Sequence, residues 1–390
     1  MTVASRLVSA TREWSYHVAL TPGISAGDVA ELVRVIAGRK SLLVTTPTVA
    51  RLYASEITSR LLLSGVDVSM VIVECTEQSK TLQEVESLCR ECFGAGMDRK
   101  SILIGCGGGV CTDLVTMAAA ITRRGLAYLR IPTTLIGLID AGIGIKGAVN
   151  LPGKKSAMGV FCPPEHVLLD PAFLKTLPVE LMSDGLAEAI KVGIALDPIL
   201  FEFLEQFSDQ LVSFPSMASM EVLSELVWRS SLRLIEELEP NLYEDKTYMR
   251  VLDFGHTFSP LIESLSNFRV THGVAVAIDI ALSSAVACEL DLLTLGGRDR
   301  ILRSLINAGL PIYSPLLTGE NCARSLGEIE AHRGGQLNLV VPTGIGSTKF
   351  ITEKRSLPLS VLQRAIGELE KETRDGLLTT ADLVVAQTTP

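Results

Sequence analysis

Short apolar runs rich in β-branched residues alternate with helical patterns through the first half of the chain. The predicted strands lie within 40–45, 66–74, 101–105 and 127–134, and the predicted helices lie within 46–53, 81–96 and 110–125. Strands separated by helices need crossover connections, and these place neighbouring strands parallel. The pattern therefore predicts a Rossmann-like α/β domain with a parallel sheet.

From about Leu177 the pattern becomes almost entirely helical, with few strand candidates. The predicted helices lie within 181–196, 197–207, 221–238, 273–290 and 298–309. We place the boundary near Pro178, which predicts an α/β domain over 1–178 and a helical domain over 179–390. A chain of 390 residues is long enough for two cores.

Charge and composition limit the kinds of binding partner and the cellular compartment that we expect. The formal net charge of −9 argues against nucleic acid or an anionic membrane surface as the main partner. The first 20 residues have no uninterrupted apolar core, and no stretch long enough to span a membrane is free of charges. The eight cysteines are scattered, which is typical of reduced thiols in a cytoplasmic protein.

Three consecutive glycines, Gly107, Gly108 and Gly109, lie between a predicted strand and a predicted helix. Such a turn lets the backbone approach a pyrophosphate, whose negative charge the helix N-terminus favours. The spacing is not GxGxxG, so a tight turn without a ligand is an equal alternative. Asp113, one turn into the helix, could bind a ribose or nicotinamide group, or could simply be a charge in the first turns of the helix.

Two of the five histidines, His256 and His272, adjoin glycines at predicted helix starts. Together with Glu188 they would form a three-ligand site that leaves one metal position open. Lys191 lies three residues after Glu188, on the same helix face, where it could reach a metal-bound substrate. The alternative is that each histidine is a helix cap or a packed side chain.

A flexible polar loop rich in glycine and cations is predicted over 131–159. It carries Asp140, Lys146, Asn150, Lys154 and Lys155, and Arg123 and Arg124 lie just before the preceding strand. Lysines in such a loop could bind a phosphate as point charges. The alternative is an ordinary surface loop with solvated lysines.

Four blocks occur in an order and at spacings that resemble dehydroquinate synthase and the related sugar phosphate cyclases. They are GGGVCTDLVTMAAAITRRG, IPTTLIGLIDAGIGIKGAVN, LKTLPVELMSDGLAEAIKVG and DFGHTFSP followed by VTHGVAVA. The resemblance runs from about Leu42 to Gly346. It implies an NAD- and metal-dependent enzyme that acts on a small sugar phosphate and forms homodimers.

The resemblance also implies roles for individual residues. The metal ligands would be Glu188, His256 and His272, holding zinc or a similar divalent ion such as cobalt. The NAD contacts would be Thr46, Thr48, Glu77, Lys80, Gly107, Gly108, Gly109, Asp113, Thr133, Thr134, Asp140, Lys155, Thr176 and Leu177. The catalytic and substrate contacts would be Lys146, Lys155, Lys191, Arg250, Asp253 and, from the neighbouring subunit, Arg124. His332 and Arg333 fall near a further cationic position of the family.

Departures from the dehydroquinate synthase pattern point to one branch of the family. Asp253 and Pro260 stand where dehydroquinate synthases have asparagine and histidine, as in the branch that cyclises sedoheptulose 7-phosphate. That branch, the 2-epi-5-epi-valiolone synthases, forms a C7 cyclitol and releases phosphate through transient NAD oxidation, β-elimination, reduction and an intramolecular aldol step. Ser156 and Val274 depart from the asparagine and glutamate that many relatives have.

Other activities stay open at this point. The resemblance also allows 2-epi-valiolone synthase, and less readily desmethyl-4-deoxygadusol synthase, a branch with tryptophan where Phe258 stands. The next alternative is 3-dehydroquinate synthase. After it comes an NAD-dependent polyol dehydrogenase, a family that would have histidine where Val192 stands. A binding protein on an inactive cyclase scaffold is the remaining class, against which intact Glu188, Lys191, His256 and His272 argue.

Overall fold

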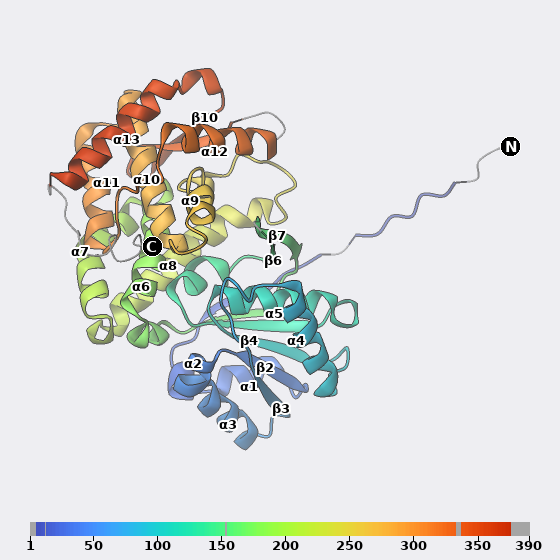
Figure 1. The fold of residues 1–390 in the computed structure, drawn as a ribbon. Helices are drawn as coiled ribbons and strands as arrows, with labels where there is room; N and C mark the ends of the chain where they lie inside the picture. The colour runs from blue at the N-terminus through green and yellow to red at the C-terminus, as the bar shows by residue number, and fades with distance from the viewer. Residues whose placement is uncertain (1–4, 12, 153, 333–336, 376–390) are drawn as a thin grey trace.

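Six parallel strands form the sheet of the first half, in the order β1-β8-β5-β4-β2-β3 (Figure 1). The computed structural model describes residues 5–11, 13–152, 154–332 and 337–375. The strands are β1 (His17–Leu20), β2 (Ser41–Thr45), β3 (Val68–Ile72), β4 (Ile102–Gly107), β5 (Ala127–Pro132) and β8 (His166–Leu169). The predicted parallel α/β sheet is therefore confirmed.

Helices cover both faces of this sheet. They are α1 (Ala30–Ile36), α2 (Pro47–Val49), α3 (Ser55–Leu63), α4 (Leu82–Gly94) and α5 (Gly109–Ile121). Leu43 and Ile104 pack with α1 and α3, whereas Leu42 and Leu103 pack with α4 and α5. Because successive strand side chains point to opposite faces, one apolar run supplies both cores.

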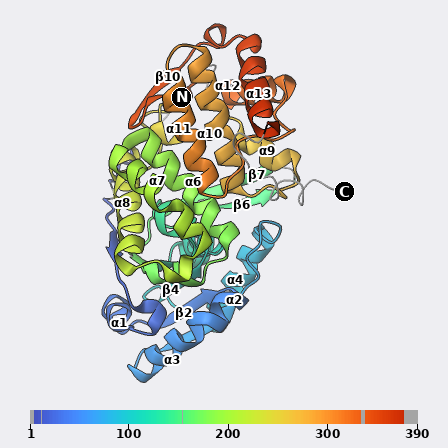
Figure 2. The same cartoon turned by 90° about the vertical axis from the view of Figure 1, so that its left-hand side faces the viewer.

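The second half is a helical bundle built around α10 (Figure 2). Its helices are α6 (Val179–Leu196), α7 (Pro198–Ser213), α8 (Met220–Leu238), α9 (Ser259–Leu265), α10 (His272–Glu289), α11 (Leu295–Asn307), α12 (Gly319–His332) and α13 (Leu359–Arg374). A small antiparallel pair, β9 (Leu339–Gly344) and β10 (Ser347–Ile351), packs beside it. Among the described helices α10 alone is long and apolar enough to span a bilayer, but 78% of it is buried, as expected for a core helix.

The two halves share one apolar core. Leu135 and Leu138, which follow β5, and Val167 of β8 belong to the same buried cluster as Leu186 of α6 and Val276 of α10. The helical part begins with α6 directly after Pro178. The division into domains at 178 and 179 agrees with this start and stays our proposal.

The segment predicted as a flexible polar loop instead contains a β-hairpin between the two halves (Figure 1). It is formed by β6 (Lys146–Leu151) and β7 (Lys154–Phe161). Gly147 lies so close to α5 that a Cβ there would come within 2.6 Å of Thr116. Val149 is fully buried against the same helix layer. The prediction of a loop was wrong because Gly147 and Val149 pack inward against α5 and so hold the segment as a strand pair.

Candidate active site

The three residues predicted to bind a metal come together from separate elements. Glu188 lies on α6, His256 follows the short helix 251–253, and His272 begins α10. Glu188 Oε1 lies 3.0 Å from His272 Nε2 and 3.6 Å from His256 Nε2. One candidate ligand atom from each residue lies within 4.8 Å of the others. Residues separated by as many as 84 positions thus form one cluster.

Helix α6 fixes the start of α10 and thereby the direction of His272. Asp184, one turn before Glu188, accepts hydrogen bonds from Thr271 Oγ1 at 2.5 Å and from the Val274 amide at 3.2 Å. A Cβ on Gly273 would lie 2.2 Å from Asp184 Cα, so only glycine allows this approach. Asp184 therefore acts as an external N-cap.

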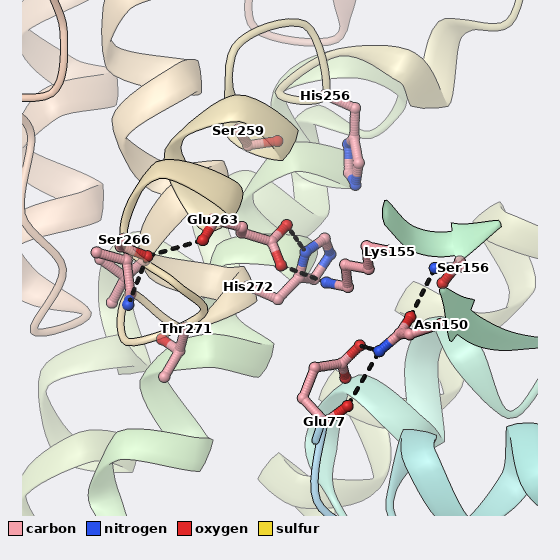
Figure 3. Close-up of polar contacts among 12 residues, drawn as sticks. Glu77, Asn150, Lys155, Ser156, His256, Ser259, Glu263, Ser266, Thr271 and His272 are labelled. Carbon is pink, nitrogen blue, oxygen red and sulfur yellow. Dashed lines mark hydrogen bonds and ion pairs between the residues drawn. The ribbon is translucent and has the colours of Figure 1, made fainter. Parts of the chain in front are cut away.

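Glu263 of α9 links His272 to the hairpin (Figure 3). His272 Nδ1 lies 3.0 Å from Glu263 Oε1, and Lys155 Nζ donates to Glu263 Oε2. Burial opposes the charged form of Glu263, but His272 and Lys155 outweigh it and hold its pKa at about 2. Burial likewise lowers the pKa of His272, yet Glu188 and Glu263 raise it to about 9. The carboxylate thus orients the imidazole, which is the usual support of a metal-binding histidine.

Asp279 supports the segment that follows His256. Its carboxylate is fully buried and accepts hydrogen bonds from the Phe258 and Ser259 amides, at 2.5 and 2.9 Å. Burial raises the pKa of Asp279 to about 6 despite these donors. His256 Nδ1 lies 3.2 Å from the Phe254 carbonyl oxygen, and its Nε2 faces Glu188 Oε1 at 3.6 Å. Burial, and then the charge of Lys191, lowers the pKa of His256 to about 4, so its Nε2 is available as a neutral ligand.

The donor set fits a divalent metal. One carboxylate and two imidazoles form a three-residue site that leaves a position for substrate. Glu188 Oε2 is buried and accepts no hydrogen bond of ordinary geometry, although Lys191 Nζ lies 2.5 Å away. Burial lowers the pKa of Lys191, but Glu188 and Asp140 outweigh it and raise the pKa. Burial and then Glu188 raise the pKa of Asp140, which lies in the same electrostatic cluster.

The glycine turn between β4 and α5 fits a dinucleotide. No side chain caps α5, so its first amides can bind an anion. The neighbours of the turn are residues predicted to contact NAD: a Cβ on Gly108 would come within 3.0 Å of Thr134, and the Thr133 amide donates to Gly107. Thr46 also lies beside Gly107, from the end of β2. The backbone approach that the glycines were predicted to allow is therefore sterically possible.

Three other predicted NAD contacts meet beside the hairpin. Lys80 and Asp113 form an ion pair of 2.5 Å, and Lys80 is 5% exposed. Burial raises the pKa of Asp113, and Lys80 opposes this. Glu77 accepts hydrogen bonds from the Asn150 side chain through its backbone and side-chain oxygens, at 3.0 and 2.8 Å. These two bonds tie the hairpin to the sheet domain, and within the hairpin Asn150 accepts from the Ser156 amide at 2.7 Å (Figure 3).

Lys146, Arg250 and Asp253 form a second charged cluster at the hairpin. Arg250 Nη2 lies 2.8 Å from Asp253 Oδ1. Lys146 and Arg250 both pair with Glu244, a residue that the sequence did not single out. Asp253 also lies near enough to Lys191 to contribute to its raised pKa.

A few predicted residues lie apart from these contacts. Thr48 is exposed on α2, and Thr176 is exposed and bonds Tyr53. Leu177 is buried beside Thr176. Arg124 is exposed at the end of α5 opposite the glycine turn, so it does not join the site of its own chain. Its predicted role in a neighbouring subunit stays a prediction, and Arg333 lies outside the described residues.

Sequence reasoning missed the groups that support the predicted residues. They are Asp184, Glu244, Glu263, Asp279 and Arg130. Arg130 is fully buried in β5 and donates to the carbonyl oxygens of Gly142, Gly144 and Lys146, which orders the turn before the hairpin. For Arg130, Asp184 and Asp279 the available signal was a charged residue inside an otherwise apolar element, which needs a partner when buried, whereas Glu244 lies in a polar segment that carries no such signal.

Comparisons with known proteins agree with the geometry. The 3-dehydroquinate synthase N-terminal family matches residues 70–184, and the 3-dehydroquinate synthase C-terminal family matches residues 185–327. A 2-epi-5-epi-valiolone synthase of Streptomyces glaucescens is 38% identical over 363 residues, 92% of each chain. A 3-dehydroquinate synthase of Pelotomaculum thermopropionicum is 34% identical and covers 91% of this chain and 97% of its own.

A solved structure extends the likeness to three dimensions. The 2-epi-5-epi-valiolone synthase of Streptomyces hygroscopicus subsp. jinggangensis, with NAD+ and Zn2+ bound, superposes with a TM-score of 0.88 at 33% identity. The match covers 94% of this chain and 99% of that one. The likeness of fold therefore extends over both halves of the chain.

Proposed function

The chain belongs to the dehydroquinate synthase-like family of sugar phosphate cyclases, and from this we propose that it is a 2-epi-5-epi-valiolone synthase. It converts sedoheptulose 7-phosphate into a C7 cyclitol and inorganic phosphate. Its cofactors are NAD and a divalent metal, of which zinc is the favoured one. The observation that carries this proposal is the meeting of Glu188, His256 and His272 beside Lys191. The similarity to valiolone synthases over nearly the whole chain supports it.

In this proposal the metal and NAD bind at two different ends of the site. Glu188, His256 and His272 hold the metal, and the glycine turn with Lys80 and Asp113 holds NAD. When bound, these cofactors supply the polarisation of a hydroxyl and the reversible transfer of a hydride, with no net redox change. Lys191 carries its proton at Nζ, 2.5 Å from Glu188, where it can donate to a substrate oxygen.

The hairpin places the phosphate. Lys146 and Lys155 project from β6 and β7, and Arg124 would be added by a neighbouring subunit. Their contribution is mainly one of position, since elimination needs the leaving phosphate held in one orientation. Atoms balance without a further reactant, because the sugar phosphate yields a cyclitol and phosphate alone.

We further propose a homodimer in the cytoplasm. In this proposal the exposed Arg124 reaches the active site of the neighbouring subunit. The eight cysteines are all free thiols, which suits a reducing compartment. Gel filtration coupled to light scattering tests the dimer, and a mass of one chain would contradict it.

Phosphate release tests the activity. Sedoheptulose 7-phosphate and the dehydroquinate precursor are incubated separately with enzyme, NAD and Zn2+, and the products are identified by NMR. Release from the heptulose alone, with the 2-epi-5-epi-valiolone spectrum, is the expected result. Release from the precursor alone would make the protein a 3-dehydroquinate synthase, and another cyclitol spectrum would place it in a sister branch.

A further inference from the structure

Two cations of the substrate end share a single carboxylate. Glu244 forms ion pairs with Lys146 of the hairpin and with Arg250, which come from segments about a hundred residues apart. Arg250 has a second carboxylate partner, Asp253, whose Oδ1 and Oδ2 lie 2.8 Å from Nη2 and 3.3 Å from Nε. The cluster thus contains two positive and two negative charges.

The backbone around Glu244 is held in an unusual conformation. Its φ of 54° lies in the left-handed region, which residues other than glycine, asparagine and aspartate seldom adopt. Asn241 stabilises the turn: its carbonyl oxygen accepts from the Glu244 amide at 2.9 Å, and its side chain bonds Lys246 and Thr247. A strained residue held by its neighbours is a reason to look for a function.

From these contacts we infer that Glu244 is a specificity-determining residue that selects against a substrate carboxylate. This inference rests on the proposed function. Glu244 and Asp253 balance the charges of Arg250 and Lys146, so the cluster has no net positive charge to offer an anion, whereas the carboxylate oxygens can accept hydrogen bonds from hydroxyls. Sedoheptulose 7-phosphate carries a hydroxymethyl group where the dehydroquinate precursor carries a carboxylate. The two carboxylates therefore cancel the attraction that Arg250 and Lys146 would offer to the precursor's carboxylate, and they do not oppose the sugar's hydroxyls.

The test compares wild type with Glu244→Gln and Glu244→Asp. For each enzyme with NAD and Zn2+, kcat/KM and KM are measured for sedoheptulose 7-phosphate. The dehydroquinate precursor is then added as an inhibitor of this reaction, and its Ki is measured. The ratio of Ki to KM cancels any effect on the phosphate that both compounds carry. We expect Glu244→Gln to lower this ratio about tenfold or more, because it removes one negative charge without changing size. Glu244→Asp keeps the charge and should retain most of the discrimination.

Glu236→Gln is the matched control, since Glu236 is exposed on α8 and pairs with Arg233, away from the candidate site. Its ratio should stay within about twofold of wild type. An unchanged ratio in Glu244→Gln, including the case where both constants fall together, would overturn the inference and make Glu244 only a competitor for the phosphate. If wild type does not turn over sedoheptulose 7-phosphate, the proposed function itself fails. Thermal melting of each variant shows whether a loss comes from unfolding instead.

Discussion

Replacing Glu263 with glutamine is expected to weaken metal binding about tenfold. Glu263 is 4% exposed and touches no predicted ligand atom of the metal directly, but its Oε1 lies 3.0 Å from His272 Nδ1. Glutamine keeps an acceptor oxygen and removes the charge. A hydrogen bond to a charged group contributes about 1.5–3 kcal/mol and a neutral one about 0.5–1.5 kcal/mol. The difference, roughly 1–1.5 kcal/mol, corresponds to about tenfold in affinity.

The affinity is measured by titrating Zn2+ into metal-free enzyme in competition with a chromophoric chelator. This measurement needs no turnover, so a change of rate cannot be mistaken for a change of binding. Glu289→Gln is the matched control, because Glu289 lies at the other end of α10 and pairs with Arg364. It should bind Zn2+ within about twofold of wild type.

Lys155→Met distinguishes the effect of the contact between Glu263 and Lys155 from that of the contact between Glu263 and His272. This variant removes the ion pair with Lys155 and leaves the contact between Glu263 and His272 intact. We expect its Zn2+ affinity to equal or exceed that of wild type, because the freed carboxylate can polarise the imidazole more strongly. An affinity in Glu263→Gln within about twofold of wild type would refute the reasoning, and so would equal losses in both variants.

Three further changes and one control test the scaffold. Gly273→Ala should destabilise the protein by about 2 kcal/mol or more and weaken Zn2+ binding, since the new Cβ would lie 2.2 Å from Asp184 Cα. Gly296→Ala, with nothing within 4 Å, should be neutral or stabilising by up to about 1 kcal/mol, and chemical denaturation distinguishes the two. Arg229 and Arg233 overcome the effect of burial and lower the pKa of Asp197 to about 2, below its ordinary value of 3.8. The stability from this charge is complete above pH 4 and is lost as pH falls toward 2, so Asp197→Asn should flatten the stability profile in that window and leave the cap of α7 in place. If Asp197→Asn lost as much stability as wild type between pH 4 and pH 2, this prediction would be contradicted. Ser156 has a φ of 47°, so Ser156→Asn should raise the melting temperature slightly, because asparagine tolerates this conformation better, and a lower value would contradict it.

Local patterns were sufficient to predict the elements and part of the site. The apolar runs of β2 and β4 lie wholly in the interior, and a parallel sheet covered on both faces requires this. Glu188 and Lys191 are three residues apart on one helix, so the helical repeat alone places them together. These predictions succeeded because the geometry that they need is repeated every few residues along the chain.

The partners of buried charges depend instead on where distant segments meet. Arg130 interrupts an apolar strand in the sequence, and only the fold shows that the carbonyl oxygens of Gly142, Gly144 and Lys146 surround it. The hairpin was predicted as a loop because the segment is rich in glycine and lysine, and only the fold shows that Gly147 and Val149 pack against α5.

The sequence by itself determined the α/β and helical halves, the ligand types and the family. Only the tertiary structure decided that Glu263 supports His272 and that Glu244 joins Lys146 to Arg250. The physical reason is that residue type and periodicity report which groups prefer burial or a metal, whereas electrostatic contacts act over a few ångströms between segments whose separation along the chain carries no information about distance.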